Sequence, residues 1–239
     1  MSDDFKKMVR IYTADSTIRV MAPVAAFGLT LALRQRDLAV LGLLALGWAL
    51  YLLEEHAIHR FVFHAPAPKQ QFLFDLLYRL HYGHHDQQRN KDLLFTPLWF
   101  ALPIALVTIA ALSLVLPLND ALIAVCGGSV SGYLFFEWLH LTSHFRMTKG
   151  RLGRHVTRRH AKHHNIDYSH WFTVSPGGEL VDAALGSDPA KYSVVPNVLT
   201  CGLDRDDPRF VKSRIRYGLD SSLHNNPAAA VRTQLEQAT

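Results

Sequence analysis

Long stretches without a charged residue are the feature that most limits what this 239-residue chain can fold into. Residues 93–119 and 121–136 contain no Asp, Glu, Lys or Arg, and only Asp120 separates them. Two shorter uncharged runs, 20–33 and 38–53, come earlier in the chain. A helix needs about 20 apolar residues to cross a bilayer, and the run 93–119 is long enough by itself. The pattern predicts an all-α integral membrane protein, a four-helix bundle made of two hairpins.

The two shorter runs could also be buried helices of a soluble protein. They are apolar on every face, they flank one another, and a second pair follows, so the membrane interpretation is favoured. Pro103 lies inside the longest run, where a membrane helix tolerates it better than a soluble one does. Gly128 and Gly132 form a G-x-x-x-G pattern, which allows close approach of two helices, with simple flexibility as the alternative.

The distribution of Lys and Arg predicts the orientation in the membrane. Basic residues cluster near the N-terminus, between the two hairpins and after the last run, whereas the hairpin tips carry only Arg34 and Arg36. Both termini and all histidine clusters are therefore expected on the cytoplasmic side. We expect residues 1–19 to form a surface segment, 20–185 the membrane-embedded domain with a cytoplasmic helical cap, and 186–239 a cytoplasmic tail.

Three segments outside the spans have predictable local structure. Residues 72–82 have apolar side chains at helical spacing, which predicts a helix lying along the membrane surface. Residues 171–182 are rich in turn-forming residues. Asp207 and Pro208 are suited to begin a short helix through Tyr217. Cys126 and Cys201 form no C-x-x-C pattern, so neither a disulfide framework nor a thiolate metal site is indicated.

Fourteen histidines are present, and most of them are clustered. Side chains three or four apart share one helix face, and neutral imidazole is a common ligand of Zn, Fe and Cu. Ten ligands are too many for one ion, so the clusters predict a two-metal site. The ten candidate ligands are His59, His64, His81, His84, His85, His140, His144, His160, His163 and His164.

The first pair, His59 and His64, is spaced differently from the others. Residues five apart diverge by roughly 140° on an ideal helix, so these two converge only if the helix ends or bulges there. His56 could replace His59 as a ligand if the register differs. We otherwise expect structural or solvated roles for the four remaining histidines, which are His56, His155, His170 and His224, although His170 follows the last cluster closely enough to support one of its ligands.

Carboxylates and cations near the clusters are further candidates. Glu137 lies three residues before His140 and could orient its imidazole, whereas Asp86 and Asp167 could equally be solvated loop residues. Residues 146–162 contain seven Lys or Arg and no acid, and we expect most of them to form a basic loop between the third and fourth histidine motifs. This basic segment could contact anionic lipid headgroups or an acidic electron donor.

Four motifs in order carry a resemblance to a known family. They are H-x4-H from His59, H-x2-H-H from His81, H-x3-H from His140 and H-x2-H-H from His160. The sequence resembles the fatty acid hydroxylase superfamily of membrane di-iron enzymes, and looks most like its fatty acid and ceramide 2-hydroxylase branch. In that branch Glu137 has an acidic counterpart, and Asp182 stands in the place of the Asp of a similar FGVTSxxWD-type ending. Thr173 departs from that ending, where Gly is usual, and no Trp precedes Asp182.

The resemblance implies an O2-dependent lipid hydroxylase, a monooxygenase with two iron ions, although zinc can occupy such a site in a preparation. It implies a lipid acyl substrate, with C2 of a fatty acid or sphingolipid chain as a candidate position. Electrons would come from a separate donor of ferredoxin or cytochrome b5 type with its reductase. A sterol- or carotenoid-type hydroxylase or desaturase is the alternative, and a membrane metal transporter or sensor is a second one. No nucleic-acid partner is expected.

Overall fold

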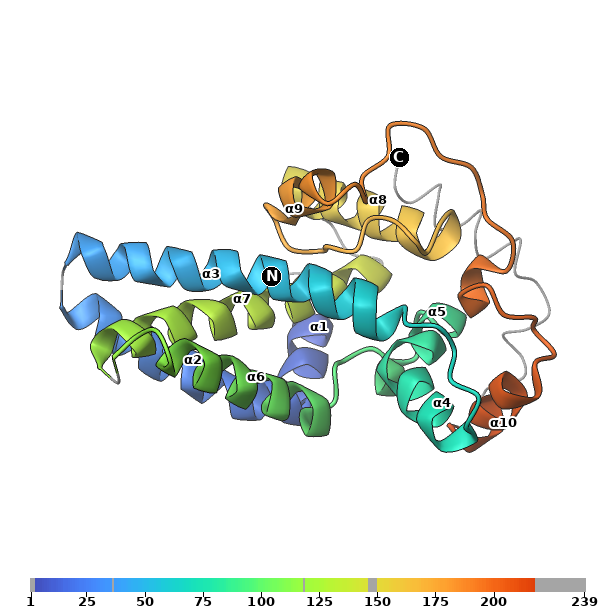
Figure 1. The fold of residues 1–239 in the computed structure, drawn as a ribbon, viewed down its shortest axis with the longest axis horizontal. Coiled ribbons are helices and arrows are strands. Elements are labelled where there is room, and N and C mark those ends of the chain that lie inside the picture. Colours follow the sequence, from blue (N-terminus) through green and yellow to red (C-terminus); the bar gives the residue numbers. More distant parts are fainter. Residues whose placement is uncertain (1–2, 36, 118, 146–149, 218–239) are drawn as a thin grey trace. The chain divides into compact units, whose positions relative to one another are not determined.

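The computed structural model describes residues 3–35, 37–117, 119–145 and 150–217, and these residues form helices and loops without a β-strand. The longer elements are shown in Figure 1. They are α1 (Asp3–Ala14), α2 (Ser16–Arg34), α3 (Leu38–Ile58), α4 (Gln71–Leu77), α5 (Gly83–Asp86), α6 (Leu98–Ser113), α7 (Asp120–His144), α8 (Arg151–Asn165), α9 (Gly178–Ala184) and α10 (Pro208–Arg216). Two π-helices, η1 (His59–Phe63) and η2 (Tyr78–Tyr82), and two 3-10 helices, η3 (Lys91–Leu93) and η4 (Val198–Thr200), complete the set.

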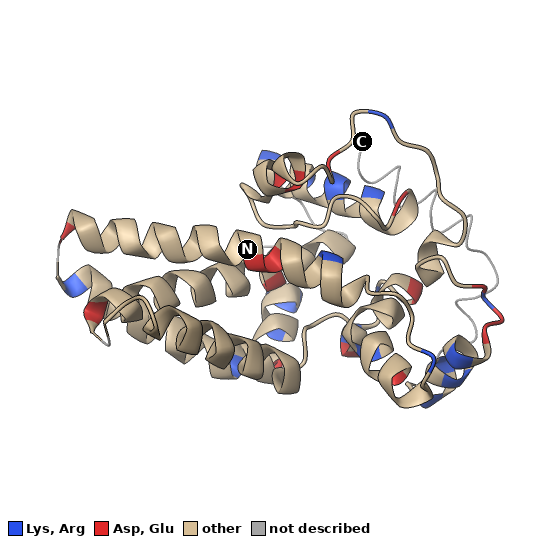
Figure 2. Ribbon diagram, in the orientation of Figure 1, with Lys and Arg blue, Asp and Glu red and all other residues tan. Residues whose placement is uncertain are grey.

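Four helical stretches are long and apolar enough to cross a membrane, which confirms the predicted number of spans. They are Ser16–Arg34, Leu38–Phe63, Lys91–Ser113 and Asp120–His144. Charged residues gather at or near the ends of these helices (Figure 2). The all-helical prediction is also confirmed for the described part of the chain. The hairpin pairing and the side of the membrane stay predictions.

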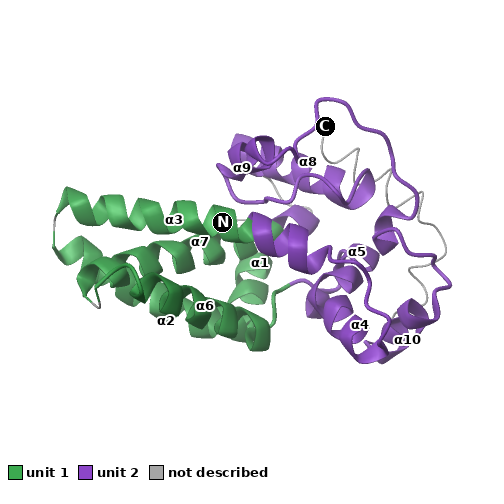
Figure 3. Ribbon diagram, viewed as in Figure 1, with its two compact units in different colours: residues 1–55, 95–141 green, residues 56–94, 142–239 purple. Residues whose placement is uncertain are grey.

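The chain divides into two compact units, coloured separately in Figure 3. The first comprises residues 1–55 and 95–141, and the second comprises 56–94 and 142–239. Both α3 and α7 begin in the first unit and end in the second. The segment boundaries expected at residues 19 and 185 stay predictions, and residues 218–239 of the expected tail lie outside the described residues.

Close helix contact holds α3 against α7 in the first unit. A Cβ atom added to Gly128 would lie 2.1 Å from the Leu44 carbonyl oxygen, and one added to Gly47 would lie 2.0 Å from that of Val125. Real Cβ atoms do not approach so closely, so only glycine fits at these positions. The close approach predicted for Gly128 is therefore confirmed, with Gly47 as its unpredicted counterpart on the partner helix.

A buried carboxylate ties the segment just before α6 to α7 in the same unit. Glu137 has no exposed surface, and its Oε1 accepts from the Thr96 N–H (3.0 Å) and from the Tyr133 hydroxyl (3.0 Å). Thr96 in turn accepts from the Thr17 hydroxyl at 2.9 Å, which adds α2 to the network. A carboxylate on a membrane helix is expensive beside lipid, so its interior position follows from the cost.

In the second unit, α10 packs against α4. The Ser213 hydroxyl donates to Asp75 at 2.7 Å, and the side-chain amide of Gln71 donates to the Arg209 carbonyl at 3.1 Å. Aromatic residues of η2 and α10 form a buried core between them. The helix predicted over 72–82 is confirmed as α4 followed by η2. The helix predicted from Asp207 is also confirmed, because Asp207 caps α10 by accepting from the Arg209 N–H at 2.9 Å.

One local expectation was wrong, and a second is confirmed only for residues 171–177, which form loop and turn. Most of the basic segment interpreted as a loop is the helix α8, which buries Val156, His160, His163 and His164 while Arg151 and Arg158 stay exposed. The segment expected to be turn-rich ends in α9, which starts after Gly177 in a left-handed conformation (φ 92°). A short helix that begins at the second residue of a Gly-Gly pair has the composition of a turn, so its sequence pattern is misleading.

Candidate metal centre

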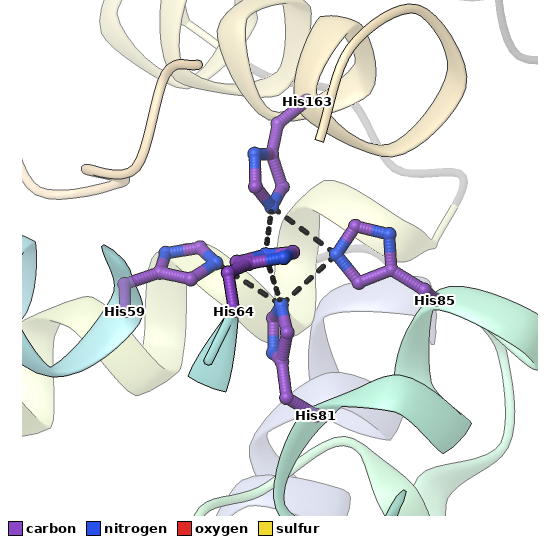
Figure 4. A group of neighbouring side chains, drawn as sticks. All are labelled: His59, His64, His81, His85 and His163. Carbon is purple, nitrogen blue, oxygen red and sulfur yellow. Dashed lines mark hydrogen bonds between the residues drawn. The ribbon is translucent and has the colours of Figure 1, made fainter. Parts of the chain in front are cut away.

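Five histidines of the second unit bring their ring nitrogens together. They are His59, His64, His81, His85 and His163, hereafter the first group, and one ligand atom of each lies within 4.8 Å of the others. Figure 4 shows the rings converging, with Nε2 atoms facing inward. The Nε2 of His81 lies 2.9 Å from those of His64 and His85 and 3.1 Å from that of His59. All but His64 are buried.

A π-helix makes His59 and His64 converge. The His64 N–H donates to the His59 carbonyl at 3.1 Å, five residues back, so η1 contains one more residue in its turn than an α-helix does. The two rings then stack with centroids 5.2 Å apart and an interplanar angle of 26°. Of the two possibilities expected here, a helix end or a bulge, the structure shows a bulge. The second π-helix, η2, which contains His81, was not expected.

A second group combines His84, His144, His160 and His164, with His140 one turn before His144 on α7. The Nε2 atoms of His144 and His160 lie 2.7 Å apart. The rings of His84 and His144 meet edge to face with centroids 4.5 Å apart. Both ring nitrogens of His164 are buried without a hydrogen-bond partner. All ten predicted ligands therefore fall into two groups of five, and His56 belongs to neither.

Each H-x2-H-H motif is divided between the two groups. His81 and His85 join the first group and His84 the second, whereas His160 and His164 join the second group and His163 the first. In each motif the residues four apart stay together, because they lie only about 40° apart around a helix while the third residue lies roughly 60–100° away. The spacing allowed this division, but it did not indicate which group each pair would join.

The hydrogen bonds of the first group determine which nitrogens can bind a metal. The Nδ1 of His163 donates to the His170 carbonyl at 2.7 Å, and the Nδ1 of His59 donates to the Phe172 carbonyl. A carbonyl oxygen only accepts, so Nδ1 carries the proton and Nε2 keeps a lone pair. These lone pairs face other imidazole nitrogens at about 3.1 Å, an arrangement that a cation between them would stabilise. The donor set therefore fits a metal ion.

The protonation of the cluster supports the same conclusion. Burial, followed by the proximity of other imidazoles, lowers the pKa of His64, His81, His85 and His164 well below the ordinary histidine value of 6.5. Burial also lowers the pKa of His163. These imidazoles are neutral at pH 7, and the neutral form is the one that binds metals.

Asp182 is fully buried and accepts hydrogen bonds from several elements. Its Oδ1 accepts from the His56 Nδ1 at 2.9 Å, and its Oδ2 accepts from the Thr173 hydroxyl at 2.7 Å and from Arg159 at 2.9 Å. His56 is only 1% exposed, so its expected structural role agrees with its environment. Thr173, which departs from the family pattern, is one of the residues that bind this carboxylate.

The other candidate residues have mixed outcomes. Asp86 forms a bidentate ion pair with Arg214 (2.7 and 2.9 Å), and Asp167 pairs with His170 at 2.7 Å, so neither is only a solvated loop residue. His155 is exposed, and His224 lies outside the described residues. The carbonyls of His170 and Phe172 were not predicted as parts of the site, because every residue has a carbonyl and no side-chain pattern marks these two.

Comparison with known proteins agrees with this geometry. Over 127 aligned residues the chain is 31% identical to the fatty acid 2-hydroxylase of Rattus norvegicus, and the aligned region covers 52% of this chain and 34% of that protein. It is 30% identical over 137 residues to the fatty acid 2-hydroxylase of Homo sapiens (56% and 36%) and 30% identical over 123 residues to a dihydroceramide fatty acyl 2-hydroxylase of Arabidopsis thaliana (51% of each). The chain thus spans about a third of the mammalian relatives and about half of the plant one.

A solved structure has a similar fold. The chain superposes on full-length scs7p, of which only the hydroxylase domain is visible, with a TM-score of 0.63 and 23% sequence identity over 74% of this chain and 65% of that one. The fatty acid hydroxylase family pattern matches residues 44–187, more than half of the chain. That match contains all ten clustered histidines and Asp182. The chain therefore belongs to the fatty acid hydroxylase family, as its four histidine motifs predicted.

Proposed function

We propose that this protein is a membrane enzyme that hydroxylates an unactivated C–H bond of a lipid acyl chain, with O2 as co-substrate, at a di-iron centre. The observation that carries the proposal is the assembly of ten histidines into two compact groups of five. The names of the relatives, fatty acid 2-hydroxylase and dihydroceramide fatty acyl 2-hydroxylase, favour a fatty acid or sphingolipid chain and its C2 position.

In this proposal each group holds one ion. When bound, two iron ions would supply the O2 activation that converts C–H to C–OH. The chain contributes neutral imidazoles, because burial keeps His64, His81, His85, His163 and His164 unprotonated at pH 7. It also orients ligands through the carbonyls of His170 and Phe172, and burial of the groups excludes water from the reacting atoms. Glu137 and Asp182 are proposed as residues that help to orient the ligands without binding the metal themselves.

The proposed topology has two membrane hairpins with a helical cap on the cytoplasmic side. The four candidate spans and the distribution of Lys and Arg support it. Both termini and the histidines then lie on the cytoplasmic side. Residues 1–19 would lie on the membrane surface, 20–185 would be embedded with their cap, and 186–239 would form a cytoplasmic tail. A lipid carbon near the polar headgroup, such as C2, would lie at the level of the metal groups.

The electron donor is proposed to be a separate acidic protein of ferredoxin or cytochrome b5 type, with its reductase. The support is the exposed basic face of α8, where Arg151, Arg154 and Arg158 follow one another at helical spacing and no acidic residue occurs in the helix. Electron transfer should weaken steeply with ionic strength if the donor docks there. A charge reversal, Arg158→Glu, should raise the KM for the donor while membrane attachment stays unchanged.

The function is tested by lipid mass spectrometry on purified protein reconstituted with iron, an electron donor and bilayer lipid. The wild type should form a 2-hydroxy acyl product in the presence of O2 and after loading with iron rather than zinc. The variants His81→Ala, His140→Ala and His163→Ala should each lose product formation. His155→Ala is the matched control, because His155 is an exposed histidine of α8 outside both groups. Product formation retained in all three cluster variants would refute the proposal.

A further inference from the structure

Two carbonyls that bind the first group come from one short segment. His170 and Phe172 accept from His163 and His59, and only Trp171 lies between them. Trp171 has a left-handed backbone (φ 56°), which is rare and costly for a bulky residue. Such a conformation persists only where the surroundings impose it, so specific contacts must hold this segment in place.

Several hydrogen bonds hold the segment in place. The Trp171 N–H donates to the Ser187 carbonyl, and its indole N–H donates to Asp188, both at 2.8 Å. On the other side, the Thr173 N–H and hydroxyl donate to Asp182 at 3.2 and 2.7 Å. Each residue next to the two accepting carbonyls is thus attached to a carboxylate.

A single arginine joins the two carboxylates. Arg159 donates to Asp182 at 2.9 Å and to Asp188 at 2.7 Å, and its side chain is only 13% exposed. It is the residue before His160 on α8, the helix that also carries His163. Asp182 in addition accepts from His56, one turn before His59. We call Asp182, Asp188 and Arg159 the carboxylate clamp.

We propose that the carboxylate clamp is a positioning device for the metal held by the first group. It fixes Trp171 and Thr173, these fix the carbonyls of His170 and Phe172, and the carbonyls fix the tautomer and direction of His163 and His59. Both of these histidines belong to the first group, so loss of the clamp weakens metal binding by the first group more than metal binding by the second. Loss of such an outer partner typically costs 10–100-fold in metal affinity.

The inference rests on the proposed two-metal site and is tested by metal release. The full-length protein in detergent is loaded with zinc, and release to a chelator is followed in time. The variants His81→Ala and His144→Ala assign the two phases, since each removes a ligand of one group. Asp182→Asn should accelerate the first-group phase 10–100-fold and leave the other phase within twofold. The matched control is Asp207→Asn, which removes a carboxylate paired with Arg209 elsewhere in the same unit and should change neither phase.

The outcomes separate the two proposals. The positioning role alone would be overturned if the wild type binds two zinc ions and Asp182→Asn accelerates both phases equally, or accelerates neither. Fewer than two ions in the wild type would overturn the di-metal proposal and this inference together. If Asp182→Asn does not fold, Asp188→Asn and Thr173→Val test the same clamp by removing single contacts. Each should accelerate the first-group phase several-fold, and an unselective effect would again refute the role.

Discussion

The contact between α3 and α7 allows a sharp test of the fold with two substitutions on one helix. Gly47 and Gly42 both lie on α3, but their surroundings differ. A Cβ atom at Gly47 would meet backbone atoms of α7, the Val125 carbonyl oxygen at 2.0 Å and the Ser129 nitrogen at 2.9 Å. A Cβ atom at Gly42 would meet nothing within 4 Å. The two Gly→Ala variants therefore add the same atoms to the same helix, with and without a clash.

The magnitude follows from the distances. Real Cβ atoms essentially never approach another atom more closely than 3.0 Å, so α3 and α7 must separate by about 1 Å in Gly47→Ala. Backbone atoms cannot rotate away as a side chain can. Overpacking of this kind costs about 1–3 kcal/mol, which lowers the Tm of a chain of this size by roughly 2–12 °C. Gly42→Ala should leave Tm unchanged or raise it, because alanine has the higher helix propensity by about 1 kcal/mol.

The assay is thermal unfolding of the metal-loaded protein in detergent, with both variants measured beside the wild type. The quantity that decides is the difference in Tm between Gly47→Ala and Gly42→Ala, since changes in helix propensity are common to both. A difference below about 1 °C would mean that the backbones of α3 and α7 do not touch at Gly47. The close-packing interpretation of the first unit would then be wrong.

Three further predictions concern the second unit. Without metal, the folded state should lose stability as the pH falls from 7 to 5. The pKa values of clustered histidines are lowered in the folded chain, so below about pH 6.5 only the unfolded chain takes up protons. The free energy of unfolding then falls by about 1.4 kcal/mol per pH unit for each such histidine. A Tm of the metal-free protein that stays constant over this range would contradict the prediction. Addition of zinc at 100 times its Kd should raise stability by about 2.7 kcal/mol for each site, measured as a rise in Tm that a chelator reverses. Arg214→Met should lower the free energy of unfolding by about 3–5 kcal/mol, because it leaves the carboxylate of Asp86, whose side chain is 4% exposed, buried without its ion pair. Arg216→Met is the control, because the side chain of Arg216 is more exposed than that of Arg214.

Much of the fold was predictable because it depends on properties that a sequence states directly. Uncharged length indicates a span, and glycines four apart indicate close packing, as Gly128 shows. An end or a bulge of the helix at His59 was also predictable, since two ligands five residues apart cannot converge on a regular helix, and the structure decided for the bulge. The helix α9 was missed because its composition is that of a turn, and the second π-helix was missed because the histidines three and four residues apart from His81 on could converge on a regular helix.

The candidate site was predictable to a similar extent. Its ten histidines were identified from spacing, and the structure brings all of them into two groups. Asp182 was indicated only by resemblance, while Arg159 was seen as part of a basic loop and Asp188 was not considered. Their importance depends on contacts between α8 and the segment after it, and residues that are far apart in sequence leave no periodic signal of such contacts.

The sequence by itself determined the all-helical class, the four candidate spans, the histidine inventory and the family, because these depend on residue type and local spacing. Tertiary structure decided how the histidines divide, so that His84 and His85, adjacent in the chain, belong to different groups. It also decided which backbone carbonyls orient His59 and His163. The physical reason is that spacing defines directions around one helix axis only, whereas a metal group is closed by side chains and carbonyls from several segments.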